Sequence, residues 1–138
     1  MPVAFGFHPY VTLPGVDRAD WQLHAPVRRR AVLDARGLPT GASEPCTIAG
    51  APIGARTFDD LFPELDTPAR FTTSGGGRRV SVAFDGGYPC AQIFAPPGEQ
   101  VICFEPMTAP TNALVSGEGL RLVAAGDEFS AAFSIEVD

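Results

Sequence analysis

Two short segments carry the residues best suited to proton transfer, and they lie near opposite ends of the chain. The first, Phe5–Tyr10, has the sequence FGFHPY and contains His8; the second, Ile102–Thr108, has the sequence ICFEPMT and contains Glu105. Each places one titratable side chain among apolar neighbours and beside a proline. A carboxylate against apolar neighbours has a raised pKa, which suits a general base, and a histidine titrates near neutral pH. The two segments therefore offer an acid and a base for proton transfer without a cofactor.

Each of these side chains also has a purely structural interpretation. Glu105 precedes Pro106, where we expect strand pairing to stop, so it is either a base at a strand end or an ordinary solvated glutamate. His8 is held extended by Pro9 and is either a proton donor or a half-buried structural histidine. Asp59 and Asp60 lie in an aromatic-flanked turn, where they either cap the turn or accept hydrogen bonds from the hydroxyl groups of a polyol.

The composition indicates one globular domain and narrows the range of partners. A chain of 138 residues, 45% hydrophobic and 19% charged, is suited to a single core. The net charge is −6 and every basic residue other than histidine is an arginine, which argues against nucleic acid as the partner. The one basic cluster, Arg28–Arg30, is either an exposed strand start or a local anion contact.

The cysteine spacing and the hydropathy pattern indicate whether the chain has a metal site and in which compartment it is located. The chain has three cysteines and no CxxC pair, which predicts free thiols in a reducing compartment and no metal site. No apolar run approaches the about 20 residues that a membrane helix needs, and no basic-then-apolar leader opens the sequence. We therefore expect a cytoplasmic protein without membrane contact.

Short alternating segments predict the elements that must position the candidate residues. Apolar side chains occupy every second position from Phe129 to Val137, which indicates a strand with one buried face. Arg79–Phe84 alternates in the same way, and we expect it to form a hairpin with Pro89–Phe94 through the turn between them. Val101–Phe104 is apolar on both faces, as a central strand would be. Phe58–Phe62 is predicted to be a single helical turn.

No sustained helical periodicity is present, and 15 glycines and 14 prolines separate the short apolar runs. This pattern predicts an all-β fold, an antiparallel β-sandwich formed by one domain over residues 1–138.

Four motifs, taken in order, resemble those of the aldose 1-epimerase (galactose mutarotase) family. They are FGFHPY followed by Leu13–Gly15, the loop Gly37–Gly41 (GLPTG), Asp59 with a phenylalanine three residues later, and CFEPMT at Cys103–Thr108 followed by Asn112. A single one of these motifs would be a weak signal, whereas four in the same order are fairly specific.

The resemblance implies a galactose mutarotase-like supersandwich and a cofactor-free isomerase without a metal. Glu105 would take the proton from the C1 hydroxyl of an aldose sugar, and His8 would protonate the ring oxygen. Asp59 and Tyr10 would contact the sugar. The ring would open to the aldehyde, rotate about the C1–C2 bond and close on the other face, which interconverts the α and β anomers.

The resemblance covers nearly the whole chain but only the C-terminal half of the family. The family's N-terminal half supplies a further histidine and an arginine, and neither has a counterpart here. We therefore expect a partial sandwich whose exposed strand edges are covered by a second copy, in a homo-oligomer, or else by a partner chain that carries the missing half. Three functions stay open: an aldose 1-epimerase, a non-catalytic carbohydrate-binding module, and an inactive truncated epimerase.

Overall fold

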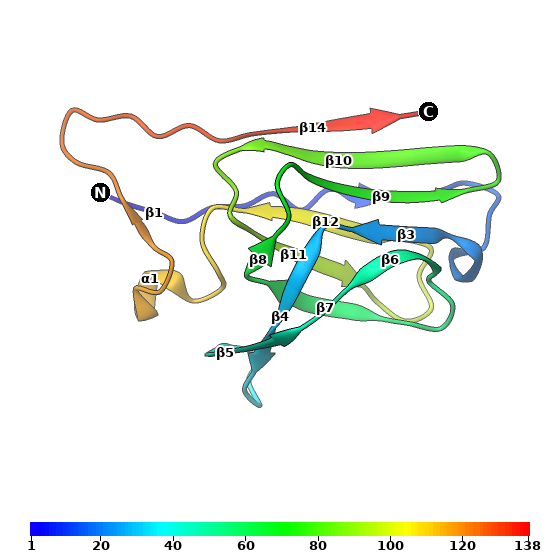
Figure 1. Ribbon diagram of the computed structural model, residues 1–138, viewed down its shortest axis with the longest axis horizontal. Helices are drawn as coiled ribbons and strands as arrows, with labels where there is room; N and C mark the ends of the chain where they lie inside the picture. The colour runs from blue at the N-terminus through cyan, green and yellow to red at the C-terminus, as the bar shows by residue number, and fades with distance from the viewer.

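Two antiparallel sheets pack face to face in the computed structural model, which describes residues 1–138 (Figure 1). The five-stranded sheet comprises, in spatial order, β14 (Ala132–Val137), β10 (Arg78–Gly86), β9 (Ala69–Gly75), β3 (Gln22–Ala25) and β6 (Ile48–Pro52). The four-stranded sheet comprises β2 (Tyr10–Val11), β12 (Ile102–Met107), β11 (Cys90–Ala95) and β7 (Phe58–Phe62). The predicted all-β antiparallel sandwich is confirmed.

Smaller elements flank the two sheets. A three-stranded sheet has the order β5 (Pro39–Pro45), β4 (Val27–Leu33) and β8 (Glu64–Leu65), and β1 (Pro2–Val3) pairs with β13 (Arg121–Leu122). The helical elements are the 3-10 turn η1 (Arg18–Asp20) and the one-turn helix α1 (Ala113–Ser116). Neither approaches the length and apolar character that a membrane-crossing helix requires.

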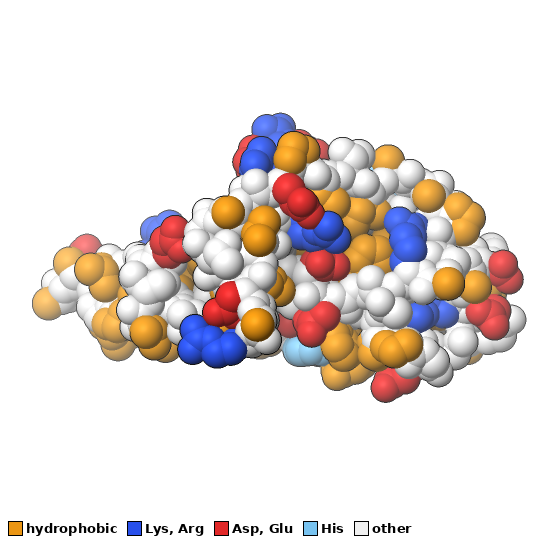
Figure 2. All heavy atoms as spheres, turned by 90° about the horizontal axis from the view of Figure 1, so that it is seen from below, with side chains coloured by type: hydrophobic (Ala, Val, Ile, Leu, Met, Phe, Trp, Pro, Cys, Tyr) orange, Lys and Arg blue, Asp and Glu red, His pale blue; other side chains and the backbone are white.

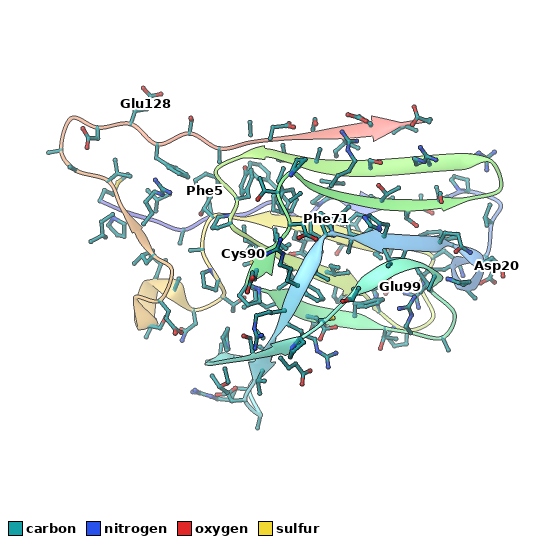
Figure 3. All side chains as sticks on the ribbon, viewed as in Figure 1. Phe5, Asp20, Phe71, Cys90, Glu99 and Glu128 are labelled. Carbon is teal, nitrogen blue, oxygen red and sulfur yellow. The ribbon has the colours of Figure 1, made fainter.

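Aromatic side chains join the two sheets at the core. The ring of Phe71 on β9 lies 5.0 Å from that of Phe84 on β10 and 5.5 Å from that of Phe104 on β12, measured between centroids. Figure 3 shows Phe71 between the strands at the centre of the molecule. Trp21 is completely buried and donates its indole N–H to the carbonyl of Val16 at 3.0 Å. Each such aromatic contributes about 1.5–3 kcal/mol through burial.

The predicted hairpin between Arg79–Phe84 and Pro89–Phe94 is wrong. Strand β10 pairs with β9 and β14, whereas β11 pairs with β12 and β7 in the other sheet. The residues between β10 and β11 therefore carry the chain from one layer to the next. The tight hairpin is the preceding one, β9–β10, whose two turn residues Gly76 and Gly77 have φ of 58° and 75°. Two successive positive φ angles are typical of a two-residue hairpin turn.

Two further local predictions are wrong in ways that affect the site. Phe58–Phe62 is strand β7 and not a helical turn, because it pairs along its whole length with β11. Strand β12 does not stop at Glu105 but continues to Met107, with Pro106 opposite Ala91. The carbonyl of Pro106 accepts a hydrogen bond from the backbone of Phe7, on the side away from β11. Although the proline has no N–H group, the β11–β12 ladder therefore loses no hydrogen bond.

Candidate functional site

One face of the four-stranded sheet packs on the core and the other is open, and the candidate residues lie on the open face. Strand alternation sends Phe104 inward and its neighbour Glu105 outward. The register places Gln92 of β11 directly opposite Glu105, and Leu61 of β7 opposite Gln92. The next row across the same face consists of Asp59, Phe94, Cys103 and Tyr10.

The segment before β2 runs alongside the end of β12 and brings His8 to this face. Gly6 forms an isolated antiparallel bridge with Met107, and the backbone N–H of Phe7 donates to the carbonyl of Pro106 at 3.2 Å. A Cβ atom on Gly6 would lie 2.8 Å from that carbonyl oxygen, so only glycine permits this close approach. The two segments that carry His8 and Glu105, about 100 residues apart in sequence, are therefore held together by backbone contacts.

Two aromatic rings fix the orientation of His8. Its imidazole stacks on Tyr10, with centroids 4.8 Å apart and planes 21° apart, and meets Phe94 edge to face at 5.7 Å. Nε2 of His8 then lies 3.0 Å from Oε1 of Glu105. The histidine side chain is 46% exposed and the glutamate side chain 14%, so a ligand on the open face can reach the pair.

Glu105 lies in surroundings that favour its protonated form. Burial raises the pKa of Glu105 to about 7, and the negative charge of Asp59 adds to the rise. Although Oε1 is close to His8, it is buried and accepts no properly oriented hydrogen bond from the protein. A carboxyl with a pKa near neutrality can both take up and release a proton at physiological pH, as a general base requires.

Asp59 and Gln92 form a second polar group beside the acid–base pair. Nε2 of Gln92 donates to Oδ1 of Asp59 at 2.8 Å, while Oε1 of Gln92 is buried without a hydrogen-bond partner. Gln92 lies outside the four sequence motifs. The available signal was its position as the only polar residue in the apolar run of β11, opposite Glu105 in the pairing.

The other candidates are distributed as follows. Tyr10 is 63% exposed on the open face, where its ring is accessible. Asp60, adjacent to Asp59, points to the opposite side of β7 and lies 3.7 Å from Arg30 of β4, so the two aspartates do not act on one ligand. Arg30 also pairs with Glu44. The basic cluster is thus part of a strand in which Arg28 and Arg30 have acidic partners.

The cysteines do not supply a nucleophile. Cys90 and Cys103 lie on the open face but are buried, and burial raises the pKa of both thiols to about 12. They are therefore protonated at neutral pH and unreactive. All three cysteines are free, and no group of three or more His, Cys, Asp or Glu side chains is close enough to hold a metal ion.

A pocket adjoins the site on the same side of the sheet. It has a volume of ≈ 290 Å³ and is lined in part by Leu61 and Cys90, which share the open face with Gln92. Its other walls include Ser43 of β5 and Glu118 after α1. Figure 2 shows a face of the molecule on which hydrophobic side chains are exposed among arginine, aspartate and glutamate side chains. The open face is therefore bordered by a hollow of nearly the size that small-molecule pockets have.

Solved structures share this architecture. A galactose mutarotase-like protein from Clostridium acetobutylicum is 18% identical, with a TM-score of 0.83, over 100% of this chain and 48% of its own. A protein from Synechocystis sp. PCC 6803 is 26% identical, with a TM-score of 0.77, over 99% of this chain and 45% of its own. A protein from Escherichia coli K12, provisionally described as an aldose 1-epimerase, is 20% identical, with a TM-score of 0.76, over 100% of this chain and 51% of its own.

These matches are structural. No family model matches the chain, and no curated protein matches its sequence. The chain spans about half the length of the solved structures that it matches. Its fold is therefore that of about half of a galactose mutarotase-like protein.

Proposed function

We propose that the chain binds an aldose sugar and interconverts its α and β anomers, with Glu105 as the general base and His8 as the general acid. The observation that carries the proposal is the pairing of these two groups at 3.0 Å, with the pKa of Glu105 raised to about 7. The likeness to a galactose mutarotase-like protein and to a protein described as an aldose 1-epimerase supports the same reaction.

The short separation of the two groups suits this chemistry. In ring opening, the base removes the proton of the C1 hydroxyl, the bond between C1 and the ring oxygen breaks, and the acid protonates the ring oxygen. Both oxygens are attached to the same carbon, so an acid and a base that lie side by side can reach them together. Ring closure reverses both transfers, so the pair returns to its starting protonation state without any co-reactant. Each transfer contributes about 10²–10⁴ in rate.

The neighbouring side chains are suited to hold a polyol. Two buried acceptors, Oε1 of Gln92 and Oε1 of Glu105, lie on residues directly opposite each other and lack a donor from the protein. Buried polar atoms are normally hydrogen-bonded, and a hydroxyl group of a ligand supplies the donor that they need. Asp59 adds a carboxylate acceptor, and the exposed ring of Tyr10 offers an apolar surface for one face of a sugar.

Polarimetry of freshly dissolved α-glucose or α-galactose tests the proposal. The wild-type chain should shorten the time to anomeric equilibrium, and Glu105→Gln should reduce this acceleration about 10²–10⁴-fold. Glu128→Gln is the matched control, because Glu128 is exposed in the loop before β14 (Figure 3). A wild-type chain that equilibrates the sugar no faster than buffer would exclude catalysis.

A non-catalytic carbohydrate-binding module is the second candidate, and the openness of the site favours it. His8 is 46% and Tyr10 63% exposed, so the sheet alone does not shield a bound sugar from water. NMR titration with the same sugars distinguishes the two functions. Binding that perturbs the Gln92 side-chain amide without any acceleration would support the module, and no perturbation at all would exclude both.

A further inference from the structure

Strand β14 forms one edge of the five-stranded sheet, and half of its backbone groups have no partner. Figure 1 shows it as the outermost strand, paired on one side with β10 only. The backbone groups of Asp138 and Arg79 exchange two hydrogen bonds of 2.9 Å, which identifies a hydrogen-bonded pair. Because such pairs alternate, the N–H and C=O groups of Phe133, Ile135 and Val137 point away from β10.

The same three residues carry the apolar side chains of the strand. They lie opposite Phe84, Val82 and Val80 of β10, all of which belong to the core. The core partly covers Phe133, but it does not extend to Ile135 and Val137, which are 49% and 74% exposed. The strand that the sequence predicts to have one buried face therefore leaves the apolar side chains of its last residues in solvent. We refer to Phe133, Ile135 and Val137, with their outward backbone groups, as the β14 edge.

The β14 edge lacks the features that normally prevent strand addition. Natural edge strands are protected by prolines, lysines, bulges or inward-pointing charges. The opposite edge of the same sheet, β6, has Gly50 with φ of 53° and Pro52 within its five residues. Residues Phe133 to Val137 contain no proline, their pairing with β10 is regular, and their only charge, Glu136, points to the other face and pairs with Arg70.

We propose that two copies of this chain associate through the β14 edge, pairing antiparallel about a twofold axis at Ile135 to give a continuous ten-stranded sheet. In this register Ile135 faces its symmetry mate and Phe133 faces Val137 of the second copy, so every outward N–H and C=O group of the three residues is used. On the other face Glu136 lies opposite Ser134, a neutral residue. A register centred on Glu136 instead places two like charges opposite each other, which is unfavourable.

The size of the solved relatives supports a second copy as the occupant. The structural match includes the whole of this chain but only 48% of the Clostridium acetobutylicum protein and 51% of the Escherichia coli one. Two copies therefore amount to about the length of one such protein. This inference does not depend on the proposed activity.

Sedimentation equilibrium and amide hydrogen exchange test the proposal with the 138-residue chain. At tens of micromolar we expect twice the monomer mass of 14.5 kDa. The amides of Phe133, Ile135 and Val137 should be protected in the dimer and should exchange fast after dilution. The amides of Ser134 and Glu136, which bond to β10, should stay protected at every concentration.

Substitutions at Val137 isolate the edge contact. Val137→Pro removes only an outward N–H, so it leaves the pairing with β10 intact and should raise the dimer Kd about 10–100-fold through the two symmetric bonds lost. Val137→Lys should act in the same direction and places no proline in the fold. The matched control is Val115→Lys, at a valine of α1 that is 84% exposed.

Three results would overturn the proposal: a monomer at 100 µM, a dimer unaffected by both Val137 variants, or an equal loss of dimer in Val115→Lys. Association of the monomeric chain only with a different protein would assign the edge to that partner and likewise overturn self-association.

Discussion

Replacing Glu105 by glutamine should make the protein more stable at alkaline pH, although it removes the proposed catalytic base. The side chain is 14% exposed, and its Oε1 atom receives no hydrogen bond from the protein. Keeping a negative charge in these surroundings is unfavourable, and the raised pKa measures how unfavourable it is. Glutamine has nearly the same shape and carries no charge, so the substitution isolates the electrostatic cost.

The expected gain follows from the pKa of Glu105. A pKa of about 7 against the ordinary 4.5 is a difference of about 2.5, and at about 1.36 kcal/mol per pKa unit the ionised carboxylate costs the folded state about 3 kcal/mol. Below pH 4.5 the carboxyl is protonated in the folded and unfolded chains, so no cost arises. Between pH 4.5 and 7 only the unfolded chain ionises, and stability falls. Above pH 7 the full cost is present.

Urea unfolding of wild type and Glu105→Gln at pH 4 and pH 8 measures this difference. We expect about 2–3 kcal/mol of added stability at pH 8, which is a rise in Tm of about 6–12 °C for a chain of this length, and almost none at pH 4. Glu128→Gln, at an exposed position, should change stability by less than about 0.5 kcal/mol at both pH values. An equal effect of Glu105→Gln at the two pH values would refute the burial argument. So would a loss of stability at pH 8, which would show that the folded protein stabilises the carboxylate.

Three further substitutions test other parts of the structure. Asp59→Asn should lower the pKa of Glu105, because it removes the negative charge that adds to the effect of burial, and carboxyl NMR titration measures the shift. Phe71→Ala should cost about 3–5 kcal/mol in urea unfolding, since the ring is fully buried between the sheets. Gly6→Ala should reduce any anomerase activity about 10²-fold and cost about 1–3 kcal/mol, because its Cβ would lie 2.8 Å from the carbonyl of Pro106 and displace the segment before His8.

Each of these has a contrary outcome, and Phe71→Ala and Gly6→Ala also have a matched variant. Phe7→Ala, at a ring that is 51% exposed, should cost less than half as much as Phe71→Ala, and equal costs would contradict the described core. A Cβ atom at Gly86 would have no other atom within 4 Å, so Gly86→Ala should leave activity and stability nearly unchanged. If Gly6→Ala behaves like Gly86→Ala, the backbone approach does not position His8. A higher pKa of Glu105 in Asp59→Asn would contradict the electrostatic assignment.

The sequence predicted the strands better than their partners. Period-two alternation in Arg79–Phe84 identified β10 as a strand, although the fold buries both faces of that strand from Val80 to Phe84. Pairing is decided by which sheet a strand joins, and nothing within Arg79–Phe84 or Pro89–Phe94 specifies that they belong to different layers. Phe58–Phe62 was mistaken for a helical turn because five residues with apolar ends fit both periodicities. Its pairing with β11 decides the outcome.

The candidate site shows the same division between local and long-range information. The surroundings of Glu105 were predictable, because apolar neighbours in sequence become apolar neighbours on a strand. The 3.0 Å contact with His8 was not, since it depends on the bridge between Gly6 and Met107 and on rings from other elements. Gln92 was missed for the same reason. Its importance comes from standing opposite Glu105 across the β11–β12 pair.

The two buried acceptors on Gln92 and Glu105 link the stability of the protein to its proposed function. A domain that only had to fold would be more stable without these two groups. Each acceptor is buried without a donor from the protein, and the charge of Glu105 is unfavourable in these surroundings. A ligand rich in hydroxyl groups reverses this balance by donating to both atoms. This argument applies equally to a binding module and to an epimerase. Only the proton-transfer pair of Glu105 and His8 distinguishes them, because sugar binding alone requires neither a carboxyl with a pKa of about 7 nor a histidine 3.0 Å away.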